Sequence, residues 1–170
     1  MQQDELRKKK FKTPEQALAA LMRLCARAEK SQEDARRLMR GWGLAEREGE
    51  QVLARLVRDR FIDDGRYAEA FVRDKLRLSG WGEYKIRTAL QRKRIDRELI
   101  DAALAQADRQ DMAGRLRQQL ERKMRTTRHT TQYELKTKLI RYGLSLGYDY
   151  ETVVEAASGL VTDTETCDEF

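Results

Sequence analysis

One apolar pattern occurs three times along this chain, at intervals of about 50 residues. In each copy an apolar residue is followed by a second four positions later and a third five positions after that, with polar residues between them. The first two positions have the spacing of one face of an α-helix. Repetition at this period indicates tandem helical modules. The aligned residues are Ala35, Met39 and Leu44 in the first copy, Ile86, Leu90 and Ile95 in the second, and Leu135, Leu139 and Leu144 in the third.

The composition favours helices over strands. Leu and Ala together number 38, whereas Val and Ile together number 11, and the first two are the better helix formers. Hydrophobic residues make up 40% of the 170 residues, which is enough to bury a core. We therefore expect an all-α protein of three tandem three-helix modules. Each module is small, so neighbours are expected to support one another in an elongated molecule, straight or curved.

Helix start signals divide the chain. Thr13 precedes Pro14 and is followed by Gln16, so Thr13 is predicted to begin a helix with a capping box. Ser31, with Asp34 three residues later, is predicted to begin a second helix. The expected organisation is a basic N-terminal arm at 1–12, three-helix modules at 13–62, 63–108 and 109–158, and an acidic tail at 159–170.

Two turns and one carboxylate pair carry further predictions. In the first and third copies the residue before the last aligned apolar position is Gly43 or Gly143, and each is expected to end a helix in the left-handed conformation. The second copy has Arg94 at this position. Asp63 and Asp64 stand before an amphipathic stretch. We interpret this pair as a helix cap rather than as a metal or acid–base site.

The sequence argues against most enzyme classes. It contains a single His, and neither a phosphate-binding glycine loop nor a dinucleotide-binding motif occurs. Cys25 and Cys167 lie far apart, as expected of reduced thiols in a cytoplasmic protein. The longest apolar run, at 17–22, is far shorter than the roughly 20 residues of a membrane span. We expect no catalytic residue, no cofactor, no metal and no membrane association.

The formal net charge of +6 is unevenly distributed. Residues 7–12 include five basic side chains, and residues 109–141 include ten basic and three acidic ones. Residues 142–170 include seven acidic residues and no Lys or Arg. Basic clusters neutralise phosphates or dock on acidic protein surfaces, although a solvated helix surface is the alternative. We interpret the tail as a disordered, solubilising segment, and competition with nucleic acid is the alternative role.

The candidate interface is the basic face of the second and third copies. Because the basic residues are spread over both copies, contact with phosphates or a protein surface is favoured over base reading by one recognition helix. The candidate residues are Arg66, Arg73, Lys75, Arg77, Lys85, Arg87, Arg92, Lys93, Arg115, Arg122, Lys123, Arg125 and Arg128.

Residues 61–75, FIDDGRYAEAFVRDK, are followed by a Gly-Trp-Gly motif and by apolar residues at helical spacing. In this order and spacing the chain resembles the RecX family of bacterial recombinase regulators, and the resemblance extends over about 13–158. Arg94 stands where the family usually has Gly. The motif residues, to which we assign structural roles, are Asp63, Asp64, Tyr67, Ala68, Val72, Gly80, Gly82, Ile86, Leu90 and Ile95.

The resemblance implies a regulator without enzymatic activity that binds the RecA filament on single-stranded DNA, in the groove of the filament. Such binding would modulate or inhibit the recombinase, ATPase and co-protease activities of RecA in DNA repair, recombination and the SOS response. We expect a monomer whose partners are the RecA filament, single-stranded DNA and double-stranded DNA. The residues by themselves leave an alternative, a stand-alone DNA-binding protein without sequence specificity.

Overall fold

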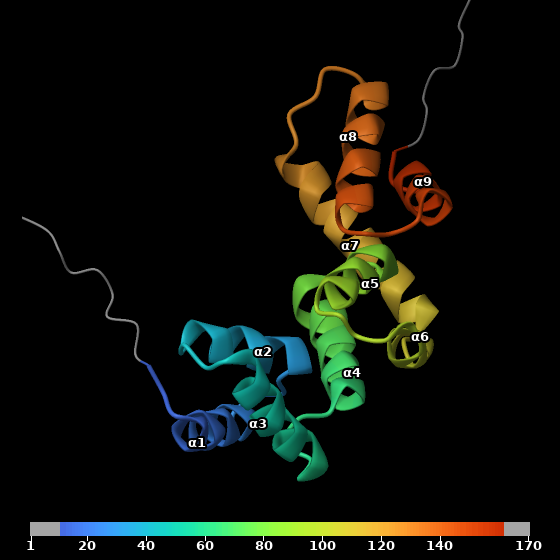
Figure 1. The fold of residues 1–170 in the computed structure, drawn as a ribbon. Coiled ribbons are helices and arrows are strands. Elements are labelled where there is room, and N and C mark those ends of the chain that lie inside the picture. The colour runs from blue at the N-terminus through green and yellow to red at the C-terminus, as the bar shows by residue number, and fades with distance from the viewer. Residues whose placement is uncertain (1–10, 162–170) are drawn as a thin grey trace, which may run out of the picture. The chain divides into compact units, whose positions relative to one another are not determined.

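The computed structural model describes residues 11–161, which are helical with short connections and contain no strand (Figure 1). The predicted all-α class is confirmed. No helix in this range has the length and apolar character needed to cross a bilayer. Most of the predicted basic arm and acidic tail lies outside the described residues. The helices are α1 (Pro14–Cys25), α2 (Gln32–Gly41), α3 (Glu46–Arg58), α4 (Asp64–Asp74), the π-helical turn η1 (Lys75–Ser79), α5 (Glu83–Arg92), α6 (Arg97–Ala105), α7 (Arg109–Thr126), α8 (Gln132–Ser145) and α9 (Tyr150–Ser158).

The described residues divide into two compact units. The first contains residues 11–70 and 91–100, and the second contains residues 71–90 and 101–161. The boundaries fall within α4, α5 and α6. The division into three modules of three helices therefore stays a prediction, and each compact unit is described by itself.

In the first unit, α3 packs against both α1 and α2. The predicted capping box at Thr13 is confirmed, and α2 begins after Ser31 as expected, with a capping box that Ser31 forms with Asp34. Thr13 Oγ1 accepts a hydrogen bond from the Gln16 N–H (3.3 Å), and Gln16 Oε1 accepts one from the Thr13 N–H (3.1 Å). These local bonds satisfy N–H groups that the helix leaves unpaired. The buried core comprises Ala17, Leu21, Ala35, Met39, Leu44, Val52, Leu53, Leu56 and Ile62.

In the second unit, α7, α8 and α9 pack against one another pairwise. Leu135 and Leu139 are buried as expected, but Leu144 is 40% exposed and Tyr148 takes the core position instead. The core of this part comprises Leu116, Leu120, Leu135, Leu139, Leu146, Tyr148, Val153, Ala157 and Val161.

The third left-handed turn lies four residues later than expected. Gly43 (φ +78°) and Arg94 (φ +55°) adopt the left-handed conformation at the expected positions. The prediction for Gly143 is wrong, because α8 continues to Ser145 and Gly147 (φ +93°) makes the turn. Gly143 instead lies inside α8, where a Cβ would stand 2.7 Å from Val153 Cγ1.

The two carboxylates of the Asp63-Asp64 pair act separately. Asp63 Oδ1 accepts a hydrogen bond from the Arg66 N–H (3.0 Å) in the first turn of α4, so the predicted cap is confirmed for Asp63. Asp64 Oδ1 accepts one from the Gln32 N–H (2.9 Å), at the beginning of α2. Burial raises the pKa of Asp64. The two carboxylates thus accept hydrogen bonds from unpaired N–H groups in the first turns of two different helices, α4 and α2.

Candidate nucleic-acid and protein interface

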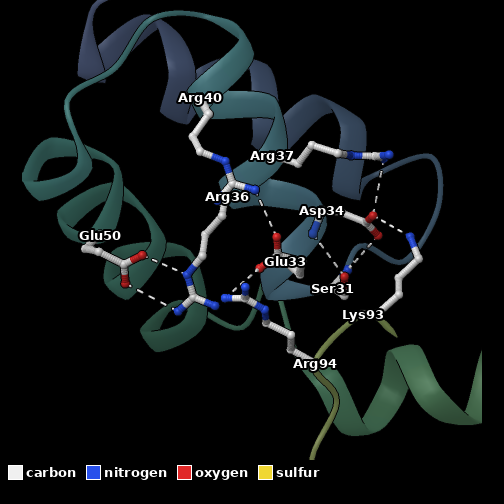
Figure 2. A network of polar contacts seen from close by, with 9 residues as sticks. All are labelled: Ser31, Glu33, Asp34, Arg36, Arg37, Arg40, Glu50, Lys93 and Arg94. Carbon is white, nitrogen blue, oxygen red and sulfur yellow. Dashed lines mark hydrogen bonds and ion pairs between the residues drawn. The ribbon is translucent and has the colours of Figure 1, made fainter. Parts of the chain in front are cut away.

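Lys93, predicted to face a partner, makes an internal contact in the first unit (Figure 2). Its Nζ lies 2.5 Å from Asp34 Oδ1, and Asp34 Oδ2 also accepts a hydrogen bond from the Ser31 N–H (3.3 Å). Burial acts to raise the pKa of Asp34, but the hydrogen bonds from Lys93 and Ser31 bring it below its ordinary value. Lys93 therefore stabilises the first turn of α2.

Further ion pairs cross the exposed side of α2 (Figure 2). Arg40 Nη2 lies 2.9 Å from Glu33 Oε1, and Arg94 Nη1 lies 4.0 Å from Glu33 Oε2. Arg36 Nε lies 2.7 Å from Glu50 Oε1, and this hydrogen bond is the largest cause that raises the pKa of Arg36. Each of these cations faces a carboxylate of its own unit, so little of this positive charge is left for a partner.

Replacing Lys93 by Met is expected to lower the free energy of unfolding by about 1–2 kcal/mol, because buried Asp34 would lose its nearer cation and keep only the longer contact with Arg37 (3.5 Å). Urea unfolding at neutral pH measures this change. Arg92→Met is the matched control, since Arg92 is exposed and forms no ion pair or hydrogen bond within residues 11–161.

Because the fold lowers the pKa of Asp34, the stabilising effect of the ion pair is present above the ordinary pKa of 3.8 and is lost as the pH falls further. The difference between the Lys93→Met variant and the wild type should therefore shrink in acid. Equal stability of the two proteins at neutral pH would contradict this role of Lys93.

The second unit contains a hollow of about 520 Å³ beside η1, α7 and α8. Four of its lining residues are cations, and none is acidic. We call it the basic hollow and define it by these four cations, which are Arg77, Arg115, Arg122 and Lys123. A concave surface with charges of one sign concentrates its field and attracts anions.

Side chains of α7 hold the backbone of η1 in place at the basic hollow. Arg115 Nη1 donates to the Arg77 carbonyl oxygen (3.4 Å), and Gln119 Nε2 donates to the Gly80 carbonyl oxygen (2.9 Å). Gly80 ends η1 in the left-handed conformation (φ +61°). Such π-helical turns are frequent at functional sites. The hydrogen bonds position the cations of η1 and α7 around one space.

The charges of the basic hollow are only partly compensated. Arg115 pairs with Asp111 (2.9 Å), but the side chains of Arg77 and Arg122 form no ion pair or hydrogen bond with the described residues. Lys123 Nζ lies 5.2 Å from the centre of the Tyr142 ring. The hollow can therefore accept phosphate or carboxylate groups without first breaking an internal ion pair at Arg77 or Arg122.

An apolar side chain stands among these cations. Leu78 lines the basic hollow and is 83% exposed, so its side chain is accessible to a partner. The sequence analysis missed Leu78. The available signal was its position two residues after Leu76, which takes it off the apolar face formed by Val72 and Leu76.

Other predicted interface residues are engaged within their own units. Arg66 Nε lies 3.0 Å from Glu29 Oε1 in the first unit. In the second unit Arg87 contacts both Asp101 and Glu83, and these hydrogen bonds raise the pKa of Arg87. These two arginines are therefore weaker candidates for a partner surface than the sequence suggests.

The Gly-Trp-Gly motif of the second copy places Trp81 between two lysines. Lys75 Nζ and Lys85 Nζ each lie 4.6 Å from the centre of its ring, and Phe71 meets it edge to face. Lys85 also donates to the Ser145 carbonyl oxygen (3.2 Å). Both lysines therefore pack against the Trp81 ring through cation–π contacts and help to cover it.

The remaining predicted cations are more accessible. Arg73 lies 3.7 Å from its neighbour Asp74, with both side chains well exposed. The side chains of Arg92, Arg125 and Arg128 form no ion pair or hydrogen bond within residues 11–161. In the same range, no group of three or more His, Cys, Asp and Glu side chains is arranged to hold a metal ion.

Comparisons with known proteins agree with this architecture. Residues 63–104 match the family model described as RecX, second three-helix domain, and residues 110–156 match RecX, third three-helix domain. The basic hollow takes lining residues from both matched regions. Both matched regions lie within the ranges predicted for the second and third modules, whose bounds stay a prediction.

Among curated relatives, the regulatory protein RecX of Clostridium beijerinckii is 37% identical over 94 residues, which are 54% of this chain and 43% of that protein. The regulatory protein RecX of Streptomyces coelicolor is 28% identical over 155 residues, which are 89% of this chain and 82% of that protein. The chain spans less than half the length of the first relatives that it matches.

Two solved structures share the fold. The crystal structure of RecX from Lactobacillus salivarius has a TM-score of 0.74 and 18% identity, covering 86% of this chain and 96% of that one. A second crystal structure, of regulatory protein RecX, has a TM-score of 0.76 and 20% identity, covering 88% of this chain and 73% of that one. At this identity the likeness concerns the fold.

Proposed function

Because this chain belongs to the RecX family, we propose that it regulates the RecA recombinase by binding the RecA filament on single-stranded DNA, in the groove of the filament. Bound there, it restrains the recombinase, ATPase and co-protease activities of RecA. It acts in the cytoplasm, without catalysis of its own, in DNA repair, recombination and the SOS response.

The basic hollow is the observation that supports this function best. A nucleoprotein filament presents phosphates and protein side chains close together. The basic hollow offers matching chemistry, because Arg77 and Arg122 are uncompensated cations and Leu78 is an exposed apolar side chain beside them. Cations provide long-range attraction and a rapid encounter, and a buried apolar contact provides affinity.

The second candidate function is that of a stand-alone DNA-binding protein. It is favoured by the same uncompensated cations, Arg77 and Arg122, because phosphate contacts release counterions whatever the base sequence. On this hypothesis Leu78 has no role, since a phosphodiester backbone offers no apolar surface of its size.

Two assays at one salt concentration distinguish the candidates. The first measures RecA-dependent ATP hydrolysis on single-stranded DNA with increasing amounts of this protein, and the second measures the anisotropy of labelled single-stranded and double-stranded DNA without RecA. We expect inhibition of hydrolysis at amounts comparable to RecA or lower. Tight binding to naked DNA with no effect on RecA would contradict the regulatory function and support the second candidate.

The variant Leu78→Ser is expected to raise the concentration for half-inhibition of RecA by about tenfold, which corresponds to about 1.4 kcal/mol. Its affinity for naked DNA should change by less than about twofold, since no charge is removed. Tyr133→Ser, at a residue with similar exposure on α8, is the control and should inhibit normally. Unchanged inhibition by Leu78→Ser would show that Leu78 does not contact RecA.

A further inference from the structure

The last nine residues of the sequence have the chemistry that the basic hollow lacks. Residues 162–170 read TDTETCDEF and contain four acidic residues and no basic one. The basic hollow contains four cations and no acidic lining residue. Carboxylates and guanidinium groups form the strongest class of hydrogen-bonded ion pairs in proteins. The segment and the hollow are therefore complementary in charge.

The segment begins close to the helix that carries most of the basic hollow. Val161, which precedes it, is buried in the core formed by α7, α8 and α9. Gly159 lies beside Arg117 of α7, and Arg115 and Arg122 of the basic hollow are on the same helix. Nine residues span up to about 30 Å, whereas an α-helix with its side chains is about 10–12 Å wide. Residues 162–170 are therefore long enough to reach the basic hollow.

Two cations of α7 and α8 outside the basic hollow are already paired with carboxylates. Arg117 is paired with Glu121 (3.2 Å), and Lys138 with Glu134 (2.6 Å). The hydrogen bond from Lys138 is the largest cause that lowers the pKa of Glu134 to about 2, so this carboxylate stays charged over the physiological range. Arg77 and Arg122 have no such partner among residues 11–161.

We propose that residues 162–170 bind the basic hollow of the same chain, with their carboxylates on Arg77 and Arg122. A tethered segment has an effective concentration in the millimolar range, so the contact forms although each exposed ion pair is weak. The bound segment competes with external anions for the same cations and thereby limits access to the hollow. An effect of this competition on RecA binding rests on the proposed function. The contact between residues 162–170 and the basic hollow does not depend on that function.

A spin label on Cys167 tests the contact directly. The label is placed in a Cys25→Ala background, because Cys25 is the free thiol of the described residues and is only partly buried. We expect paramagnetic broadening of the amide signals of Leu78, Gly80 and Gln119, independent of protein concentration. The broadening should disappear in the double variant Arg77→Glu/Arg122→Glu and at high salt.

Two outcomes of the labelling experiment would overturn the proposal. Absence of broadening around the basic hollow would show that the segment does not bind there. Broadening that grows with protein concentration would show that the segment binds a second copy of the chain instead of its own hollow.

A second set of variants measures the competition. A variant with a neutral segment is expected to bind single-stranded DNA about fivefold more tightly than the wild type. In the Arg77→Glu/Arg122→Glu background the same neutralisation should leave the DNA affinity unchanged. The neutralising substitutions are Asp163→Asn, Glu165→Gln, Asp168→Asn and Glu169→Gln. The control removes four exposed carboxylates of the first unit, through Glu15→Gln, Glu46→Gln, Glu48→Gln and Glu98→Gln.

The two proposals fail in different ways. If the broadening occurs but inhibition of RecA is absent for every variant, the intrachain contact stands and the regulatory function is contradicted. If RecA is inhibited but the control and the neutralised segment raise DNA affinity equally, net charge explains the effect, and competition at the basic hollow is contradicted.

Discussion

The double variant Arg77→Glu/Arg122→Glu is expected to raise the concentration for half-inhibition of RecA-dependent ATP hydrolysis by about 100-fold, or about 2.7 kcal/mol. Both side chains line the basic hollow and have no internal anionic partner among the described residues. Each reversal removes an attraction to the anionic filament and adds a repulsion. The measurement is ATP hydrolysis at one salt concentration, with circular dichroism to verify that the helices remain.

The control for this variant carries the same change in net charge. Arg27→Glu/Arg47→Glu alters two exposed arginines of the first unit whose side chains have no ion pair or hydrogen bond within residues 11–161. We expect its inhibition to stay within about threefold of the wild type, since exposed charges outside the binding surface are screened by salt. Equal losses in the two double variants would show that net charge, and not the basic hollow, determines binding.

The variant Gly82→Ala is expected to lower the free energy of unfolding by about 3 kcal/mol or more. The Gly82 N–H donates to the Leu146 carbonyl oxygen (2.7 Å). A Cβ on Gly82 would stand 2.5 Å from the backbone of Gly147 and Tyr148. Because these are backbone atoms, no rotamer change relieves the overlap, and the beginning of α5 would have to separate from the turn between α8 and α9.

Urea unfolding followed by circular dichroism measures this loss. Gly114→Ala is the matched control, since a Cβ on Gly114 would meet no atom within 4 Å. Within α7 this change should be neutral or stabilise the protein by up to about 1 kcal/mol, because Ala is the better helix former. Similar effects of the two substitutions would contradict the close backbone approach at Gly82.

The beginnings of several helices could be predicted because capping is local. Thr13 and Gln16, like Ser31 and Asp34, lie three residues apart, and their reciprocal hydrogen bonds form within one helical turn. A capping residue and its partner are therefore visible in the sequence without knowledge of the rest of the fold.

The end of α8 could not be predicted in the same way. Gly143 resembled the helix-ending Gly43, but α8 continues to Ser145. Inside α8, Gly143 allows Val153 of α9 to approach closely. Glycine serves both as a left-handed turn residue and as a site of close packing, and only the position of α9 distinguishes these uses.

The sequence by itself determined the all-α class, the helix starts and the excess of basic residues, because these depend on composition and on neighbours within a few positions. The tertiary structure decided which cations remain available. Lys93 meets Asp34 across 59 positions and Arg66 meets Glu29 across 37, whereas Arg77 meets no carboxylate of residues 11–161. Compensation of a charge depends on distances of a few ångströms between atoms, and the folded chain sets those distances.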